Sequence, residues 1–259
     1  MPRRASRTHP AVRGFDRAAA TYERARPDYP ATAVRHLGRV LPLGRGRTVV
    51  ELGSGTGKFT RAIEPLGAAR VAVEPTTGMR RVFERTVPAV PVLDGTAEAI
   101  PLPDGFADAV VSAQAFHWFR TGPALREIRR VLRPGGGLGL VWNTRDDSVG
   151  WSRRLTQLME PYRGRTPASR DRNWRLAFDS RRTGFTRLHR AVFRHAQHGT
   201  PALFVDRVLS VSMIAVLPAA RRRAVAARVR HLLATDPDTR GRDRIVLPYR
   251  TDVYWCHRR

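Results

Sequence analysis

The sequence is poor in cysteine, lysine and long apolar runs. Its single cysteine, Cys256, cannot form an intramolecular disulfide and excludes a metal site built from several thiolates. No stretch approaches the ~18 consecutive apolar residues of a membrane-spanning helix, and the basic start is not followed by an apolar segment of signal-peptide length. We therefore expect a cytoplasmic protein that is neither exported nor inserted in a membrane, and we expect no metal.

Negative charge is also scarce. The chain has 22 acidic residues against 47 Lys and Arg, which gives a net charge of +25 and favours a nucleic-acid partner at first sight. However, Lys58 is the only lysine, and the arginines are spread singly and in short groups such as Arg221–Arg223. No aromatic-rich RNA-binding signature is interleaved with them. We interpret the excess as a general bias toward arginine and expect no specific nucleic-acid partner.

The 259 residues, 42% of them hydrophobic, suffice for one large α/β domain or two small ones. From Thr48 onward short apolar runs alternate with amphipathic stretches, which is typical of a doubly wound parallel sheet. The expected strands are TVVEL, RVAVE, VPVL, ADAVVSA and GGLGLVWN, and the expected helices between them cover 58–66, 77–87 and 123–132.

After Asn143 this alternation stops, and we predict an insertion over the sheet that contains a helix at 151–162. An edge strand at 186–197, helices at 201–209 and 219–233, and a last strand IVLPYRTDVYWC follow. We expect a single domain over 1–259 with an N-terminal arm and helical lid (1–45), a cofactor-binding half (46–145), a variable substrate-side insertion (146–185) and C-terminal strands and helices (186–259).

The stretch VVELGSGTGKFTRAI carries the most specific motif. A phosphate loop requires GxxxxGK[ST], but Leu52 stands at its first glycine and Phe59 at its Ser/Thr. A dinucleotide fingerprint GxGxxG fails as well, because Lys58 and Thr60 stand at its third glycine in the two possible registers. Looser forms of that fingerprint remain an alternative. The pattern that fits is E-x-G-x-G-x-G, with Glu51 at the strand end.

This spacing suits a ligand that lies against the turn without being dominated by phosphate. Glycines at 53, 55 and 57 let the backbone approach closely and adopt φ values that other residues resist. Glu51 would repel a pyrophosphate but can pair with an ammonium group. Glu74 ends the second strand, about 20 residues downstream, where an acid accepts hydrogen bonds from ribose hydroxyls. We infer a nucleoside that carries an amino-acid tail.

Several segments together resemble the class I S-adenosylmethionine-dependent methyltransferases, in particular the small methyltransferase-domain group that includes trans-aconitate methyltransferase-like and ubiquinone-biosynthesis-like enzymes. They are VVELGSGTGKFT, VAVEPTTGM, DGTAEAIPLPDGFADAVVSAQAFHWF and EIRRVLRPGGGLGLVWN, and more loosely FDRAAATYERARPDYP and the closing strand. The resemblance implies an α/β fold: a Rossmann-like, doubly wound, seven-stranded sheet, mostly parallel with one antiparallel strand near the C-terminus, and helices on both faces.

The resemblance also implies S-adenosyl-L-methionine as the cofactor and assigns residues to its parts. Those expected at the methionine part are Glu51, Gly53, Ser54, Gly55 and Gly57. Those expected at the nucleoside are Glu74 for the ribose, Pro75, Met79, Thr96, Ala97 and Glu98 around the adenine, and Gln114 beneath the cofactor.

On the substrate side we expect Tyr22, Arg26, Tyr29, His117, Trp118 and Trp142. The first three would form a lid or merely cap the sheet. His117 and Trp118 would contact the acceptor or pack against the following helix. His117 is a weak candidate for a general base, and we identify no other catalytic residue.

Methyl transfer from a sulfonium is an in-line displacement, so alignment alone can supply much of the ~7 to 11 kcal/mol available from proximity. We expect a small-molecule acceptor: a carboxylate, phenol, amine or enol carbon. An RNA or protein methyltransferase is the alternative, although SAQAFHWF stands where an NPPY-type signature of amino methylation would follow the fourth strand. A non-catalytic cofactor-binding module is the second alternative, but the glycine turn is intact.

Overall fold

The computed structural model describes residues 12–164, 166–167, 172–178 and 183–259. The chain divides into two compact units. The sheet unit comprises Asp28–Thr144, Pro167–Arg194 and Arg250–Arg259, and the helical unit comprises Met1–Pro27, Arg145–Thr166 and His195–Tyr249. Residues 1–11 of the expected arm and parts of the expected insertion 146–185 lie outside the described residues. The four-part subdivision of one domain stays a prediction.

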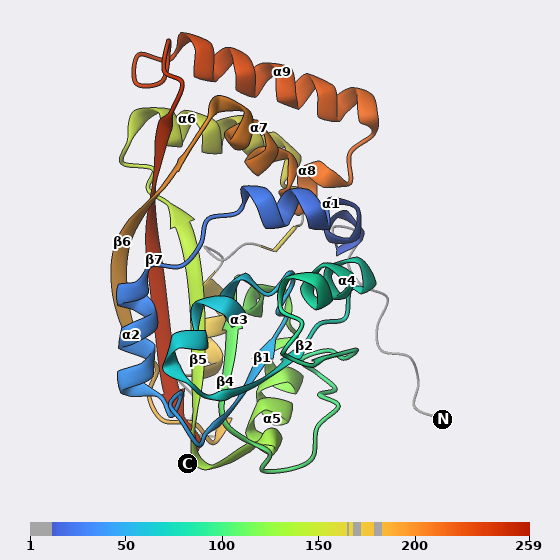
Figure 1. The fold of residues 1–259 in the computed structure, drawn as a ribbon, viewed down its shortest axis with the longest axis vertical. Helices are drawn as coiled ribbons and strands as arrows, with labels where there is room; N and C mark the ends of the chain where they lie inside the picture. Colours follow the sequence, from blue (N-terminus) through green and yellow to red (C-terminus); the bar gives the residue numbers. More distant parts are fainter. Residues whose placement is uncertain (1–11, 165, 168–171, 179–182) are drawn as a thin grey trace. The chain divides into compact units, whose positions relative to one another are not determined.

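The seven strands follow the order β3-β2-β1-β4-β5-β7-β6 (Figure 1). Strands β3, β2, β1, β4 and β5 pair in parallel, and β7 is antiparallel. The predicted seven-stranded, mostly parallel sheet is therefore confirmed. The strands are β1 (Thr48–Leu52), β2 (Ala69–Val73), β3 (Val92–Leu93), β4 (Ala107–Ala113), β5 (Leu132–Arg145), β6 (His189–Gly199) and β7 (Ile245–His257).

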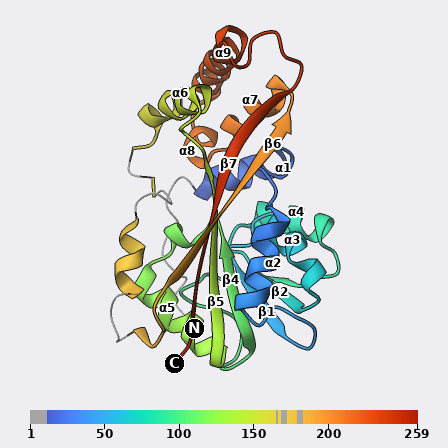
Figure 2. The same cartoon turned by 90° about the vertical axis from the view of Figure 1, so that its left-hand side faces the viewer.

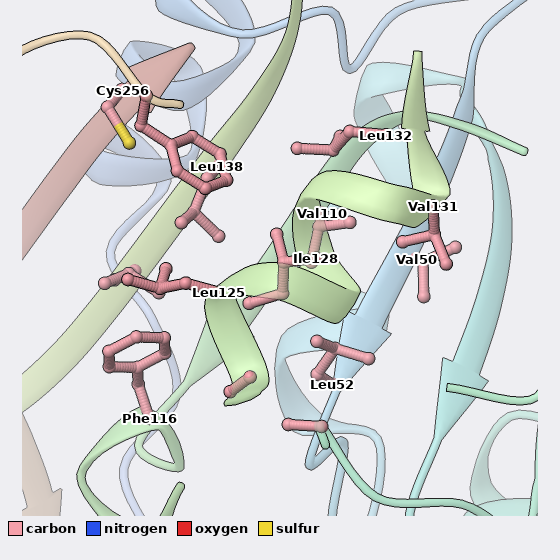
Figure 3. Packing of buried hydrophobic residues seen from close by; sticks show 14 of the residues in the cluster. Val50, Leu52, Val110, Phe116, Leu125, Ile128, Val131, Leu132, Leu138 and Cys256 are labelled. Carbon is pink, nitrogen blue, oxygen red and sulfur yellow. The ribbon is translucent and has the colours of Figure 1, made fainter. Parts of the chain in front are cut away.

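Within the sheet unit, the sheet is covered by helices on both faces, as Figure 2 shows. Successive strand residues point to opposite faces. Val50 accordingly packs in a cluster with helix α5 (Thr121–Val131), whereas Val49 packs in another with α2 (Ala31–Val40). Figure 3 shows the α5 cluster, in which Ile128 of α5 lies among buried strand residues. Strands buried on both faces explain the nearly continuous apolar runs in the sequence.

The helix predicted at 58–66 is interrupted. Helix α3 (Lys58–Ala62) ends early, and a 3-10 turn follows at Glu64–Leu66 with Pro65 as its second residue. Proline lacks the N–H that would continue the α-helical hydrogen bonding. Helix α4 (Thr77–Thr86) ends one residue before its predicted end. Helix α5 ends at Val131, one residue before its predicted end, and RPGGG (133–137) is already part of β5, which begins at Leu132.

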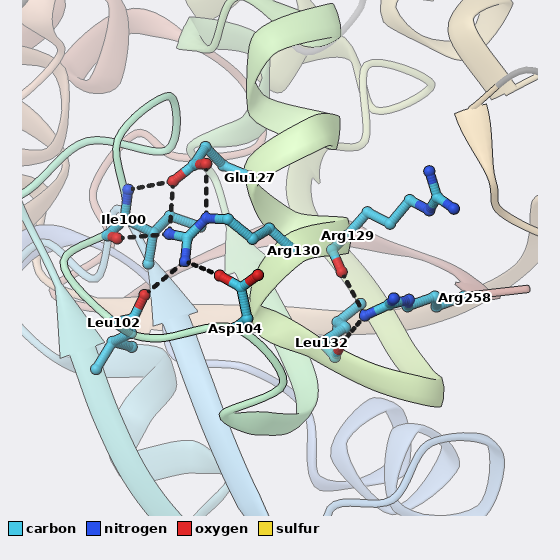
Figure 4. A network of polar contacts seen from close by, with 8 residues as sticks. All are labelled: Ile100, Leu102, Asp104, Glu127, Arg129, Arg130, Leu132 and Arg258. Carbon is cyan, nitrogen blue, oxygen red and sulfur yellow. Dashed lines mark hydrogen bonds and ion pairs between the residues drawn. The ribbon is translucent and has the colours of Figure 1, made fainter.

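Arg130 of α5 holds the segment between β3 and β4 in place (Figure 4). Its guanidinium donates to the carboxylates of Glu127 and Asp104 at 2.8 and 2.9 Å and to the carbonyls of Ile100 and Leu102 at 2.9 and 2.8 Å. The hydrogen bonds that Arg130 donates, to Glu127 first and to Asp104 second, raise its pKa. The loop that carries the expected adenine contacts is thus fixed to α5 by charge-assisted hydrogen bonds.

The helical unit has a core of its own, in which Trp151, Phe204 and Val229 are buried. The helices predicted at 151–162, 201–209 and 219–233 are confirmed to within two residues apart from a final 3-10 turn at Glu160–Tyr162. Its helices are α1 (Val12–Ala25), α6 (Gly150–Met159), α7 (Pro201–Leu209), α8 (Ser212–Ala215) and α9 (Ala219–Thr235). Among the described residues, every helix is too short or too polar to cross a membrane.

Candidate functional site

The turn after β1 is built from glycines in the left-handed region. The φ angles of Gly53, Gly55 and Gly57 are 67°, 58° and 84°. A Cβ atom on Gly53 would lie 2.6 Å from the Cβ of Ala115, and one on Gly57 would lie 2.5 Å from Cγ2 of Val87. Gly55 has open space around it, so only its φ angle requires glycine. The turn is held by its own N–H groups: Gly53 donates to the carbonyl of Val73 at 2.8 Å and Gly57 to that of Ser54 at 3.0 Å.

Glu74, which follows β2, is bonded to this turn. Its side chain is 6% exposed, and its two carboxylate oxygens accept the N–H groups of Gly55 and Thr76, each at 2.9 Å. Burial raises the pKa of Glu74, and the hydrogen bonds from Thr76 and Gly55 oppose that rise. Each oxygen retains a second lone pair, which can accept a ligand hydroxyl. Glu74 is thus hydrogen-bonded to the glycine turn that directly follows Glu51 and Leu52 in the sequence.

Glu51 lies on the sheet face that α3 covers, and it is 2% exposed. Its carboxyl group accepts a hydrogen bond from the hydroxyl of Thr60 on α3 at 2.5 Å. Burial raises the pKa of Glu51 to about 8; the Thr60 hydrogen bond opposes this rise and the charge of Glu74 adds to it. A cationic ligand group beside Glu51 would stabilise its ionised form. Thr60 was not predicted as part of the site.

Three buried hydroxyl groups at this strand edge have no hydrogen-bond partner among the described residues. They are Oγ of Ser54, Oγ1 of Thr56 and Oγ1 of Thr96. Buried polar atoms in proteins are nearly always hydrogen-bonded, and an unbonded one costs about 1 to 3 kcal/mol. Two of them belong to the glycine turn and one to the expected adenine edge. A polar ligand with an amino-acid tail and a nucleoside therefore fits these residues.

The other expected adenine contacts differ in their surroundings. Met79 of α4 and Ala97 are buried, whereas Pro75 is exposed. The carboxylate of Glu98 accepts the N–H of Arg120, just before α5, at 2.7 Å. Met79 and Ala97 can therefore supply apolar contacts, while the Glu98 carboxylate already has a structural partner.

Gln114, which follows β4, has a φ of 59° and is the one non-glycine residue with positive φ in the described part of the chain. Such strain costs about 1 to 3 kcal/mol and is concentrated at functional sites. Its Nε2 donates to the carbonyl of Asn143 at 3.0 Å. The side chain of Asn143 in turn donates to the carbonyl of Asp28 and accepts from the Thr251 hydroxyl, at 3.0 and 2.7 Å. Asn143 connects these segments, and no sequence motif predicted this role.

His117 lies in a 3-10 turn, Phe116–Trp118, and accepts a hydrogen bond from Trp142. The indole Nε1 donates to Nδ1 of His117 at 3.2 Å, and Trp142 is buried with its ring stacked on Trp174. The rings of His117 and Trp118 lie 5.5 Å apart. An indole N–H can only donate, so the neutral imidazole carries its proton at Nε2. This arrangement makes His117 a hydrogen-bond donor through Nε2.

The remaining substrate-side residues belong to different units. Tyr29 is in the sheet unit, and its ring meets that of Phe59 edge-on at 4.9 Å. Tyr22 and Arg26 are in the helical unit, where the Arg26 guanidinium lies 4.6 Å from the centre of the Tyr22 ring. The lid that these three residues were expected to form stays a prediction.

Comparisons with known proteins agree with this geometry. The methyltransferase domain family matches residues 50–140. An uncharacterised methyltransferase of Mycobacterium tuberculosis is 40% identical over 241 residues, which cover 92% of each chain.

Solved structures show the same fold. A candidate type II methyltransferase from Anaeromyxobacter dehalogenans is 23% identical with a TM-score of 0.67, over 90% of this chain and 97% of that one. Haemonchus contortus phospholethanolamine N-methyltransferase 2, solved with phosphomonomethylethanolamine and S-adenosylhomocysteine, is 15% identical with a TM-score of 0.55, over 94% of this chain and 57% of that one.

Proposed function

Because the chain belongs to the S-adenosylmethionine-dependent methyltransferases, we propose that it methylates a small-molecule acceptor. The observation that carries this proposal is the hydrogen-bonded aromatic pair of His117, in the segment after β4, and Trp142 of β5. An aromatic wall with a single well-placed polar donor is typical of small-molecule sites. Neither side chain carries a fixed charge that would attract a polyanion.

We assign the cofactor to the ends of β1 and β2. Glu74 would accept hydrogen bonds from the ribose, and Glu51 would stabilise the ammonium group of the methionine part. The unbonded hydroxyls of Ser54, Thr56 and Thr96 support this assignment, because a polar ligand would satisfy them. When bound, S-adenosylmethionine supplies an electrophilic methyl group on a sulfonium. The protein contributes binding, orientation and the exclusion of water.

In this proposal His117 orients the acceptor and does not remove its proton. Protonation at Nδ1 would break the hydrogen bond from Trp142, and Nε2 already carries a proton in the neutral ring. An acceptor that is ionised at neutral pH needs no base, so alignment at near-attack distance is sufficient. His117 would donate from Nε2 to an oxygen of an anionic acceptor such as a carboxylate.

The competing function is methylation of RNA or protein. Arg221–Arg223 on α9 are exposed, as a polyanion-binding surface would require. The segment after β4 speaks against amino methylation of a base, because the Gln114 side chain is held by the Asn143 carbonyl.

The test is a screen with labelled S-adenosylmethionine, read by mass, in which small carboxylates, phenols and amines are compared with total RNA at physiological salt. We expect labelled products among the small molecules alone. Stoichiometric labelling of a defined RNA, abolished by charge reversal of Arg221–Arg223, would replace this proposal with the competing one.

A further inference from the structure

The helical unit buries an arginine whose charge is not neutralised by its hydrogen bonds. Arg207 lies on α7 among apolar residues, and it is only 5% exposed. Its Nε donates to the hydroxyl of Tyr249 at 3.2 Å, whereas its Nη1 is buried and has no hydrogen-bond partner in the described part of the chain. A buried cation without an ionic partner costs several kcal/mol, so this nitrogen requires a ligand.

A second arginine lies beside it. Nε and Nη2 of Arg26 donate to the hydroxyl and the carbonyl of Ser210, at 3.2 and 3.1 Å, and Ser210 directly follows α7. Burial first, and the positive charge of Arg207 second, lower the pKa of Arg26 to about 9. The two guanidinium groups therefore repel each other at the C-terminal end of one helix.

In the described part of the chain, the acceptors to which Arg26 and Arg207 donate are uncharged. The hydroxyl of Tyr249, which accepts from Arg207, donates to Oε1 of Gln197 at 3.4 Å and is thereby oriented. The nearby acid of α7, Asp206, pairs instead with Arg24 at 3.4 Å, and both of those side chains are well exposed. A buried and a half-buried guanidinium group held by neutral acceptors lack, among the described residues, the ionic partner that buried guanidinium groups normally have.

We propose that Arg26 and Arg207 form a binding site for a small oxyanion, either a carboxylate or a phosphate group. Such a group offers two or three oxygens to guanidinium N–H donors, and charge-assisted hydrogen bonds of this kind are the strongest that proteins make. The site uses residues of the helical unit alone and does not depend on the proposed small-molecule acceptor.

The experiment is thermal unfolding of the cofactor-free protein with succinate or inorganic phosphate, at an ionic strength held constant with chloride. We expect one of these anions to raise the Tm of the wild type, because a ligand selective for the native state stabilises it. Arg207→Met should weaken the apparent affinity at least tenfold. Arg222→Met removes the same charge from an exposed position on α9 and should respond like the wild type. Either no response in the wild type or an equal response in Arg207→Met would overturn the site.

A direct readout separates binding from folding effects. In the ¹⁵N NMR spectrum, the Nε–H resonance of Arg207 should shift on titration with the same anion, and Arg26→Met should weaken the titration. An unshifted Arg207 resonance would overturn the site even if Tm changed.

Labelled S-adenosylmethionine then identifies the source of the oxyanion. Methylation of the bound probe would make it part of the methyl acceptor, and binding without methylation would make it a separate ligand. Both results support the site. Because binding is measured without cofactor, a failure of methyl transfer leaves this measurement unaffected.

Discussion

Both units bury ionisable side chains, but the buried acids of the sheet unit and the buried Arg207 of the helical unit are hydrogen-bonded to different extents. In the sheet unit, Glu51 and Glu74 each accept hydrogen bonds from their own chain. In the helical unit, Arg207 retains a buried nitrogen without a partner. A carboxyl group can also be neutralised by a proton, but a guanidinium in a protein cannot lose one. The comparison teaches that the buried acids and the glycine turn, here called the acidic cradle, are hydrogen-bonded within the chain, whereas Arg207 retains a buried donor that the proposed anion would satisfy.

The largest expected effect tests how firmly the acidic cradle is built. Gly57→Ala places a Cβ on a residue with left-handed backbone conformation and against the side chain of Val87. We therefore expect the free energy of unfolding to fall by about 2 to 5 kcal/mol. Gly55→Ala is the matched control, because it adds the backbone cost without the clash and should lose about 1 to 2 kcal/mol. Urea unfolding measures both. An equal loss of stability in the two variants would mean that the turn is not packed against Val87 as described.

The second effect concerns the buried acid itself. The folded-state pKa of Glu51, about 8, lies above its unfolded value, so the native state binds the proton more tightly. Stability should therefore be greatest below the unfolded pKa and fall as pH rises toward 8, by at most roughly 1.4 kcal/mol per pH unit from this group. Glu51→Gln should remove this part of the slope. The measurement is the free energy of unfolding of the wild type and of Glu51→Gln from pH 5 to 9. The same pH dependence in both proteins would contradict a raised pKa of the buried Glu51.

The third effect concerns the removal of the buried positive charge of Arg207. Arg207→Met replaces an incompletely satisfied buried cation with an apolar side chain, so in chloride buffer we expect the free energy of unfolding to rise by about 1 kcal/mol. Arg222→Met should leave it unchanged within about 0.5 kcal/mol. Urea unfolding without added oxyanions provides the test. A marked loss of stability in Arg207→Met alone would show that the guanidinium is satisfied within the chain, and the contrast between the units would disappear.

The smallest effect concerns the acceptor side. Trp142→Phe removes the donor to His117 but keeps most of the aromatic packing, at a cost of about 1 kcal/mol of transition-state stabilisation. Methyl transfer to an identified acceptor should slow by about fivefold to tenfold, with the affinity for S-adenosylhomocysteine unchanged. His117→Asn, which retains a donor, should keep more activity than His117→Ala. If activity instead disappears in both His117 variants alike, His117 acts as a base.

The acidic cradle was predictable because its determinants are local. Glu51 and the alternating glycines follow one another in the sequence, and their chemistry requires that order. The prediction of a helix over 58–66 missed the early end of α3, although Pro65 gave a local signal because proline cannot continue an α-helix. Lys58 belongs to no complete phosphate-loop motif, yet its Nζ pairs with Asp28 at 2.8 Å. That pair joins residues thirty positions apart, which no local pattern indicates.

The other residues that the sequence analysis did not predict act through contacts between distant parts of the chain. Asn143 acts through partners at Gln114, Asp28 and Thr251, which only the folded sheet unit brings together. Arg207 gave one weak signal, a charge within the apolar helix PALFVDRVL. Its burial and its proximity to Arg26 depend on tertiary structure, so the sequence could not distinguish it from the many exposed arginines.

The most direct test of the account is calorimetric titration of S-adenosylhomocysteine into the wild type, Glu74→Ala and Arg207→Met, with NAD as a competing ligand. Loss of the Glu74 hydrogen bonds should weaken cofactor binding by about 1 to 3 kcal/mol. Arg207→Met should bind like the wild type, because the two units hold different ligands. Circular dichroism would verify that both variants are folded. An unchanged affinity in Glu74→Ala, or a preference of the wild type for NAD, would contradict the assignment of the cofactor to the buried acids.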